Sequence, residues 1–477
     1  MNILLNNEKY RLDIFELSRI FLPSNYINFT SNINDKDDNL IVDIDRDIRI
    51  EFIPLKGDKK IKVFEYEDID NLEYREVKQM VKRYILELYQ NYYNKKAPWG
   101  ILTGIRPVKI VNDMIDDNKS YSEIDEILRD RYKLSENKRK LILDIGFLQK
   151  DIMFPIDYDK FNLYINIPFC PTRCEYCSFP TVVLREGKDY RNSYVEMVIR
   201  ELKGIASSLK NKKLNTIYFG GGTPTTLRLT DLEKIIKTIY DLFGTDFKEF
   251  TMEAGREDTI DYKMLKGLKD LGVTRISLNP QTMKDETLKL IGRCQDNNAL
   301  IKKYHMARDI GFDSINMDII LGLPRENLFD VQNTLEKINK LSPDNLTVHT
   351  LAVKRGSKFL DKNIDLSREN TLISDMVDFT YEFTKKYNYE AYYLYRQKQM
   401  LGNFENIGYA KDKKYCIYNM AIMEETQSII GVGMTSNSKI LYKDGSMAQF
   451  RNYKNLKDYY ENIDSLIEEK NKIIMKG

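Results

Sequence analysis

The chain has 477 residues, of which 42% are hydrophobic and 31% are charged. This length exceeds what one ordinary core accommodates, and the composition suits a globular protein of two or three domains. Lys and Arg number 74 and Asp and Glu number 72, and the resulting net charge of +2 excludes a strong overall attraction to nucleic acid or to a membrane surface.

The N-terminal sequence, MNILLNNEKYRLDIF, lacks a basic start followed by a long apolar run, which argues against a signal peptide. No uninterrupted apolar stretch reaches spanning length, which argues against a transmembrane helix. The five cysteines are odd in number and clustered, unlike a disulfide framework. We therefore expect a cytoplasmic protein that neither spans a membrane nor binds nucleic acid.

Residues 1–155 form a first region, which we expect to be an accessory α+β domain. The alternating runs NLIVDID and IRIEFIP indicate strands, and a helical pattern follows over residues 74–93. The segment PWGILTGIRPVKIVNDMID contains the only tryptophan, Trp99, which we interpret as a packing anchor before a turn that leads into a helix. The sequence indicates scaffolding as the default role of this region, with substrate or partner docking as alternatives.

The pattern changes over residues 156–390, where apolar, β-rich runs alternate with longer helical stretches. This alternation predicts parallel strands joined by right-handed crossovers. Six units are too few for a closed eight-unit barrel and predict an α/β fold with an open, partial (β/α)6 barrel, whose ligands gather at the C-terminal ends of the strands. Residues 391–477 are expected to form a less regular C-terminal region on the substrate side. The six runs are NLYINI (162–167), TIYF (216–219), FTME (250–253), RISLN (275–279), INMDII (315–320) and LTVHTL (346–351).

Three of the five cysteines lie in the stretch CPTRCEYC, directly after the first of these runs. Thiolates are soft ligands that select zinc, copper(I) or iron–sulfur clusters. A structural zinc site normally has four ligands, and nothing near the stretch supplies the fourth at a usual spacing, although four-ligand zinc stays open. A 4Fe–4S cluster explains three cysteines better, because one iron then stays open to an outside ligand. The chain's other cysteines and histidines are Cys294, Cys416, His305 and His349.

A glycine run, GGGTPT, ends the second predicted strand. Glycines allow a sharp turn and a close backbone approach, and their exposed N–H groups could bind a carboxylate. A glycine run alone usually marks only a flexible turn, so its position one βα unit after the cysteines is what makes it informative.

These motifs resemble the radical S-adenosylmethionine (SAM) superfamily, in which CxxxCxxC holds a 4Fe–4S cluster and SAM binds the open iron. The resemblance implies Cys170, Cys174 and Cys177 as the cluster ligands that generate a 5′-deoxyadenosyl radical. Further stretches resemble the coproporphyrinogen oxidase subgroup, and the flanks WGILTGIRP and LYRQKQMLGNFENIGYA resemble HemZ-type coproporphyrinogen dehydrogenases. The subgroup stretches are LYINIPFCPTRCEYC, GGGTPT, FTMEAGRED, RISLNPQTMKDETLKLIGR and INMDIILGLP.

The resemblance also implies which residues contact the cofactor. Tyr164, Gly221 and Glu253 would serve the cluster-bound SAM. A neighbouring pocket, which holds a second SAM in one member type, would be lined by Tyr176, Gly222, Thr223, Gln281, Arg293, Asp318 and Ala352.

The implied activity is the oxidative decarboxylation of two propionates of coproporphyrinogen III to vinyl groups, which forms protoporphyrinogen IX. The partners would be this tetrapyrrole and an electron donor such as a flavodoxin or a ferredoxin. The substrate's carboxylates need cations, for which Arg396 and Lys398 are candidates, with ordinary surface charge as the alternative interpretation.

Three positions depart from the family's pattern. Asn166 stands where the family has a histidine, Phe179 stands where well-studied members have another cysteine, and Gln295 replaces a histidine. The departures leave open a haem-binding chaperone with a radical SAM body, or a radical SAM enzyme acting on another tetrapyrrole. The chaperones' HNxxYW motif is absent, and the nearest stretch, YCIYNMAIM, has no histidine.

Overall fold

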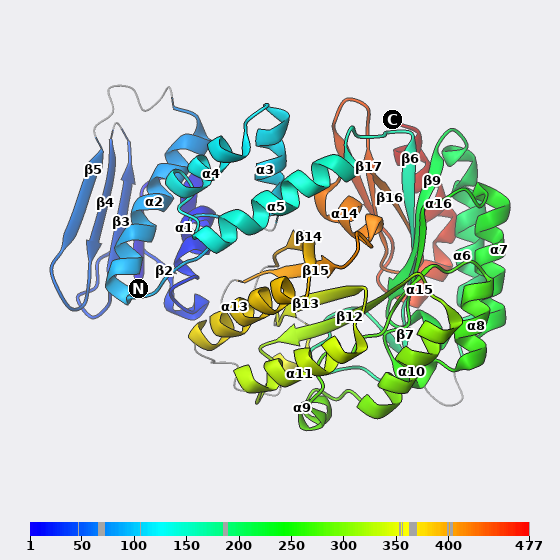
Figure 1. Cartoon of the computed structure of the whole chain (residues 1–477). Helices are drawn as coiled ribbons and strands as arrows, with labels where there is room; N and C mark the ends of the chain where they lie inside the picture. The colour runs from blue at the N-terminus through cyan, green and yellow to red at the C-terminus, as the bar shows by residue number, and fades with distance from the viewer. Residues whose placement is uncertain are drawn as a thin grey trace. The chain divides into compact units, whose positions relative to one another are not determined.

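A computed structural model gives the fold of the chain (Figure 1). None of the helices in the part of the chain that it describes combines the length and the apolar character of a membrane span. The described residues are 1–45, 47–64, 72–104, 106–184, 189–352, 354, 356–361, 370–397, 400 and 404–476.

The N-terminal part contains a five-stranded sheet with the order β2-β1-β3-β4-β5. Its long helix α2 spans Tyr74–Tyr93, as the periodicity predicts, because Val77, Val81, Ile85 and Tyr89 repeat every fourth residue and are all buried. The strands are β1 (Asn2–Leu5), β2 (Asn28–Phe29), β3 (Asn39–Ile44), β4 (Ile48–Ile53) and β5 (Lys60–Phe64), and the helices are α1 (Arg11–Ser18), α2, α3 (Pro107–Asp116), α4 (Tyr121–Asp130) and α5 (Glu136–Met153).

Trp99 precedes α3 and is 2% exposed, which confirms the expected packing role. Pro107 occupies the first turn of α3, where its missing N–H costs no hydrogen bond. The segment before α3 therefore turns into a helix as predicted.

The second sheet has eleven strands in the order β14-β15-β13-β12-β11-β10-β9-β6-β16-β17-β18 (Figure 1). Each of the six predicted runs contributes to one of six adjacent parallel strands, and the order is linear, which confirms an open, partial (β/α)6 barrel. The six strands are β6 (Lys160–Ile167), β9 (Lys213–Gly221), β10 (Glu249–Glu253), β11 (Arg275–Ser277), β12 (Ser314–Leu321) and β13 (Asn345–Thr350).

Helices alternate with these strands, as the helical patterns in the sequence predict. The short strands β7 (Phe169–Cys170) and β8 (Val182–Val183) form a separate parallel pair. The helices are α6 (Arg191–Ile205), α7 (Leu229–Phe243), α8 (Tyr262–Asp270), α9 (Asp285–Leu290), α10 (Asn297–Ile310), α11 (Leu328–Leu341), α12 (Lys358–Asp361) and α13 (Asn370–Lys386).

The C-terminal region extends both edges of this sheet, so the expectation of a less regular region is wrong. On one edge β16 pairs in parallel with β6, and on the other β15 pairs antiparallel with β13. Both NIGYA and SIIGV are buried at every position, so they lack the alternation that marks a half-exposed strand. The elements are β14 (Glu390–Tyr395), β15 (Asn406–Ala410), α14 (Ile417–Glu424), β16 (Ser428–Val432), β17 (Asn437–Leu441), β18 (Met447–Arg451), α15 (Leu456–Glu461) and α16 (Ile463–Met475).

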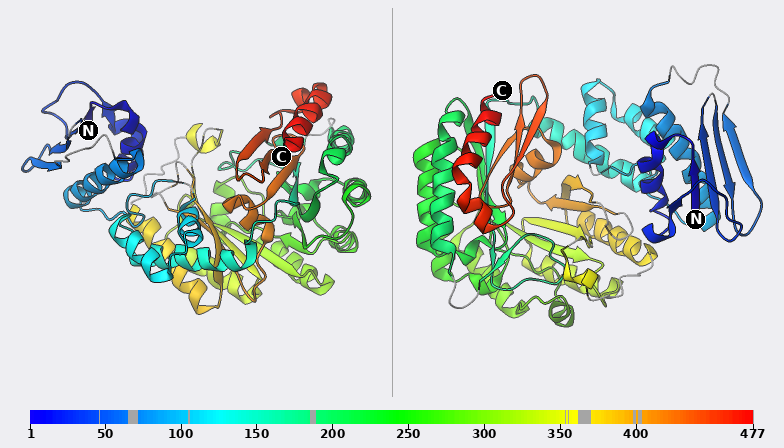
Figure 2. Two further views of the ribbon diagram at one scale, coloured as in Figure 1. Left: turned by 90° about the horizontal axis from the view of Figure 1, so that it is seen from above. Right: turned by 180° about the vertical axis from the view of Figure 1, so that it is seen from behind.

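The last helix, α16, lies beside α6 (Figure 2, red beside green). Between them, Lys470 and Glu201 form an ion pair whose side chains are 1% and 0% exposed. The C-terminal helix is therefore fixed to the barrel by a buried charge pair.

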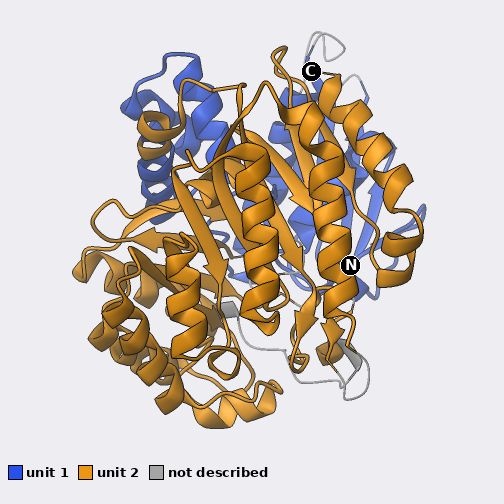
Figure 3. Cartoon of the chain, turned by 90° about the vertical axis from the view of Figure 1, so that its right-hand side faces the viewer, with its two compact units in different colours: residues 1–147 blue, residues 148–477 orange. Residues whose placement is uncertain are grey.

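The chain divides into two compact units, residues 1–147 and residues 148–477 (Figure 3). The first holds the small sheet and most of α5, and the second holds the partial barrel with its C-terminal additions. All of the cofactor residues expected from the sequence fall in the second unit.

Candidate functional site

The three clustered cysteines lie in the loop that follows β6. Cys170 belongs to β7 and accepts a backbone hydrogen bond at its carbonyl oxygen from Leu184 (3.0 Å), and a turn between Cys174 and Cys177 has an N–H···O distance of 3.1 Å. Cys174 is buried, and the other two are partly exposed. The loop thus gathers the thiols at the C-terminal end of a barrel strand.

The surroundings of these thiols disfavour negative charge unless a cation is present. Burial raises the pKa of Cys170 to about 11, and burial also raises the pKa of Cys177. Thiolate ligands require deprotonation, and a metal cluster supplies the positive charge that stabilises it. The donor set therefore fits a multi-iron cluster.

A single-ion site fits less well. No three or more Cys, His, Asp or Glu side chains converge on one point within the described ranges. An iron–sulfur cube does not need such convergence, because each cysteine binds a different iron. The number of thiols on the loop, three and not four, favours the cluster over the zinc alternative.

Residues from two other loops fix the cysteine loop. The Thr223 hydroxyl lies 3.6 Å from Cys170 Sγ. Arg256 donates to Thr172 Oγ1 at 2.9 Å and is held in place by Asp258 at 2.7 Å. Arg256 was missed by the sequence analysis, although it stands inside the quoted stretch FTMEAGRED.

The glycine run follows β9 and lies against the start of the cysteine loop. Gly221 has φ of 108°, and a Cβ there would come within 2.1 Å of Asn166 Oδ1, while a Cβ on Gly222 would come within 2.6 Å of the carbonyl oxygen of Phe169. Asn166 is fixed in turn by donating to the carbonyl oxygen of Met434 (2.6 Å). Only glycine fits these two positions, so the glycine run packs closely against the end of β6 and the start of the cysteine loop.

Glu253 ends β10 and points at the glycine run. Its Oε1 accepts a hydrogen bond from the Tyr218 hydroxyl (2.8 Å), and its Oε2 accepts one from the backbone N–H of Gly221 (3.2 Å). Burial raises the pKa of Glu253 to about 7, the Tyr218 hydrogen bond opposes this rise, and the nearby Asp318 adds to it. A carboxyl with a pKa near neutrality ionises readily when a cationic group binds beside it.

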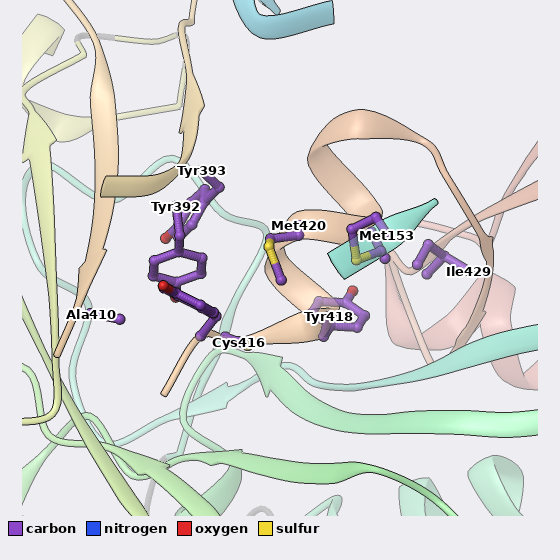
Figure 4. Close-up of a cluster of buried hydrophobic side chains, with 10 residues drawn as sticks. Met153, Tyr392, Tyr393, Ala410, Cys416, Tyr418, Met420 and Ile429 are labelled. Atoms are coloured by element: carbon purple, nitrogen blue, oxygen red, sulfur yellow. The ribbon is translucent and has the colours of Figure 1, made fainter. Parts of the chain in front are cut away.

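Three tyrosines, which we call the aromatic floor, lie beneath Glu253. The ring of Tyr418 stacks on Tyr218 at 4.4 Å and on Tyr164 at 6.0 Å between centroids. Tyr418 lies on α14, whose first N–H groups, those of Ile417 and Tyr418, donate to the carboxylate of Glu249 (2.9 and 2.8 Å). Figure 4 shows Tyr418 beside Met420 and Met153 in a buried cluster, in which Met153 of α5 packs with residues of the C-terminal region.

The sequence signal for the aromatic floor was only partial. Tyr164 is among the predicted cofactor residues, and its hydroxyl lies 3.2 Å from Asn166 Oδ1. Tyr218 stands two residues before the glycine run, where the period of a strand gives it the same face as Gly220. Tyr418 comes from a helix near the end of the chain, and no local pattern linked it to this place.

Two residues of the predicted second pocket lie together at the ends of β11 and β12. The backbone N–H of Gln281 donates to the carbonyl oxygen of Asp318 (2.9 Å), and Gln281 has φ of 63°. Its Oε1 is buried and has no hydrogen-bond partner among the described residues. Asp318 accepts from Asn316 (2.7 Å) and lies 3.7 Å from His349 Nε2, a neighbour that the sequence analysis missed.

The remaining residues of that set are more dispersed. Tyr176 packs against an apolar cluster that includes Ile291 and Phe359. The Arg293 guanidinium donates to the carbonyl oxygens of Gly255 (2.5 Å) and Asn279 (2.6 Å), so those bonds hold loop backbone. Ala352 forms an isolated bridge with Met400.

Of the two cations proposed for the substrate, Lys398 lies outside the described residues. Arg396 follows β14 and is 3% exposed, so it is not an ordinary surface charge. Burial lowers its pKa to about 10, and Glu405 opposes this shift.

Comparisons with known proteins identify the family of the chain. The chain matches the family model described as the Radical SAM superfamily over residues 164–338. It is 37% identical over 424 residues to the oxygen-independent coproporphyrinogen-III oxidase-like protein HemZ of Bacillus subtilis (strain 168), which covers 87% of this chain and 84% of that protein.

The chain is also similar to two more distant proteins. The chain is 27% identical over 318 residues to the heme chaperone HemW of Buchnera aphidicola subsp. Schizaphis graminum (strain Sg), covering 66% of this chain and 79% of that one. Among solved structures, coproporphyrinogen III oxidase (HemN) from Escherichia coli matches with a TM-score of 0.54 at 24% identity, over 67% of this chain and 72% of that chain. This last likeness shows a shared fold.

Proposed function

The chain belongs to the HemZ-type family of radical SAM proteins, and from that premise we propose that it oxidatively decarboxylates the propionates of coproporphyrinogen III to vinyl groups without oxygen. The resemblance found in the sequence is thereby confirmed at the level of the family. Membership implies a 4Fe–4S cluster and SAM as cofactors, and makes the chain a radical SAM enzyme. The choice of coproporphyrinogen III as substrate is the proposal.

One observation carries the proposal. Three thiols on one loop, a glycine turn that tolerates no side chain and a buried carboxyl meet at the C-terminal ends of β6, β9 and β10. This arrangement provides three ligands for a cluster and, in Glu253, an acceptor for the ammonium group of SAM. The similarity to HemZ suggests the substrate.

When bound, the cofactors supply the 5′-deoxyadenosyl radical that takes a hydrogen atom from the propionate carbon next to the ring. Each propionate then loses CO₂ and one further electron to a one-electron acceptor, and a vinyl group remains. The protein binds and orients the reactants and excludes water.

We assign these tasks to named groups. Cys170, Cys174 and Cys177 hold the cluster, and Glu253 accepts from the SAM ammonium group. Gly221 borders the SAM site and orients Glu253 through its N–H, and Tyr218 of the aromatic floor holds the other oxygen of that carboxyl. The pocket proposed for a second SAM comprises Tyr176, Gly222, Thr223, Gln281, Arg293, Asp318 and Ala352.

The test is an anaerobic assay of the reconstituted, reduced protein with SAM and coproporphyrinogen III. We expect 5′-deoxyadenosine to form together with stepwise loss of CO₂ from the porphyrinogen, followed by mass spectrometry. Deoxyadenosine without any change in substrate would contradict the proposed substrate. Stoichiometric haem binding with uncoupled SAM cleavage would instead favour a chaperone such as HemW.

SAM binding is expected to depend on pH through Glu253. Its pKa of about 7 means that the carboxyl is largely neutral below that value, so affinity for the SAM ammonium group rises as pH increases through 7. The affinity should fall again above about pH 8, where a free α-amino group loses its proton. Tyr218→Phe removes a hydrogen bond that lowers this pKa, so the rise should shift to higher pH.

Equilibrium binding of SAM measured between pH 6 and 9 checks this expectation. Tyr240→Phe is the matched control, because that hydroxyl donates to the carbonyl oxygen of Leu271, away from Glu253. A pH profile that is identical in wild type and in Tyr218→Phe would rule out control by this hydrogen bond.

A further inference from the structure

A groove lies on the outer surface next to the cysteine loop. Its volume is about 570 Å³, and it is formed between the segment that carries β8 and the start of α15. Its lining residues include Val182, Tyr190, Lys454 and Lys457.

The wall of the groove is bonded directly to the cysteine loop. The N–H of Val182 donates to the carbonyl oxygen of Pro168 (2.8 Å), and the N–H of Leu184 donates to that of Cys170 (3.0 Å). Strand β8, which lines the groove through Val182, therefore pairs with β7, the strand that contains the proposed cluster ligand Cys170. The lining residues of the groove do not include those assigned to the cluster or to SAM.

The surface around the groove is apolar and open. Phe179, two residues after the last cysteine of the motif, is 64% exposed, Tyr190 is 40% exposed, and Pro180 between them is also exposed. Exposed apolar residues that cluster beside a groove are typical of protein contact sites. A docked protein would bury these exposed residues, whereas a small molecule in the groove would leave them exposed to water.

Two lysines give the rim of the groove a positive character. Lys454 and Lys457 are exposed on the rim, where neither forms an ion pair with a described residue, and the lining residues include one carboxylate, Glu461. The rim therefore favours an acidic partner.

We propose that this groove, with the apolar surface of Phe179 and Pro180, is the docking site of a small acidic electron-carrier protein that reduces the cluster. The carrier loses one electron and the cluster gains one, so no proton or group is transferred. Contacts of this kind are small and transient, which suits a groove flanked by a few exposed residues. The inference rests on the proposed radical SAM chemistry, because only that chemistry requires an outside electron.

The test uses a flavodoxin as the carrier and a double variant, Lys454→Glu/Lys457→Glu, of the reconstituted protein. We expect binding of oxidised flavodoxin, measured by calorimetry at low ionic strength, to weaken about tenfold or more, and its salt dependence to decrease. Stopped-flow oxidation of the flavodoxin hydroquinone should slow by a similar factor, whereas reduction of the cluster by dithionite should keep its wild-type rate.

Lys340→Glu is the matched control, because Lys340 is an exposed lysine at the end of α11, beside strands far from β6 in the sheet order. Wild-type flavodoxin binding by the double variant, or equal loss in Lys340→Glu, would overturn the proposal. Displacement of flavodoxin by free flavin mononucleotide at equal concentration would also overturn it and assign the groove to a small molecule. All of these readouts omit coproporphyrinogen, so they are independent of the substrate assignment.

Discussion

Replacing Cys174 with alanine is expected to abolish cluster binding and all formation of 5′-deoxyadenosine. Cys174 is the buried member of the three thiols, and the remaining cysteines of the chain, Cys294 and Cys416, lie outside the motif. Loss of a ligand should exceed the roughly 10- to 100-fold effect of losing an outer-shell partner. After reconstitution, cluster binding is measured by the iron and acid-labile sulfide content of the protein and by its absorbance near 400 nm.

Two other cysteines provide matched controls for this substitution. Cys294 is exposed, and Cys416 is buried beside Glu249 at the opposite end of β10 from Glu253. Cys294→Ala and Cys416→Ala are expected to keep the iron content of the wild type. If Cys174→Ala still bound four irons and cleaved SAM, the assignment of the cluster to this loop would be wrong.

Replacing Lys470 with alanine is expected to produce the largest loss of stability in the barrel unit. The side chain of Glu201 would stay buried without its cation, and removal of one partner of a buried pair costs about 3–5 kcal/mol. Lys470 also donates to the carbonyl oxygen of Gly431 (2.7 Å) in β16, so its loss loosens a strand of the central sheet. The unfolding free energy follows from urea titrations monitored by far-UV circular dichroism.

Lys472→Ala is the matched control, because Lys472 lies two residues away, is 67% exposed and pairs with Glu468 on the surface. It should leave the urea midpoint unchanged, since surface pairs contribute little. A double change, Glu201→Gln with Lys470→Met, should recover part of the loss, because it removes both charges and keeps an acceptor for the Gly433 N–H. Equal midpoints for Lys470→Ala and Lys472→Ala would show that the buried pair is not needed.

This buried pair also connects to the site. Glu201 accepts hydrogen bonds from the N–H of Gly433 (2.9 Å) and from Tyr459 (2.7 Å). Met434, which follows Gly433 in the chain, accepts a hydrogen bond at its carbonyl oxygen from Asn166. Asn166 in turn lies against Gly221. Loss of Lys470 should therefore also weaken SAM binding, and titration of the variant with SAM measures that effect.

Asn166 explains one departure from the family pattern. A histidine is expected there, but in this chain the amide bonds to both Met434 and Tyr164, since it carries a donor and an acceptor on one short side chain. The Asn166 side chain is thereby held against Gly221 of the glycine run. That role depends on the C-terminal region, which the sequence analysis did not connect to this position.

The sequence by itself determined the local features of this protein. The six parallel strands of the partial barrel and the helix over Tyr74–Tyr93 follow from hydrophobic periodicity, which is a property of neighbouring residues. The cysteine loop and the glycine turn were recognisable because each is a short motif in which a few adjacent residues carry the chemistry.

Only the tertiary structure decided which distant segments complete the barrel and its site. The strands β15 and β16 follow the end of the regular alternation of strand and helix, so their sequences do not say which strands they join, and only pairing with β13 and β6 reveals their place. Tyr418 reaches Tyr218 across 200 residues, and Lys470 reaches Glu201 across 269. Such contacts depend on how whole elements pack, and packing at that separation leaves no pattern among neighbouring residues.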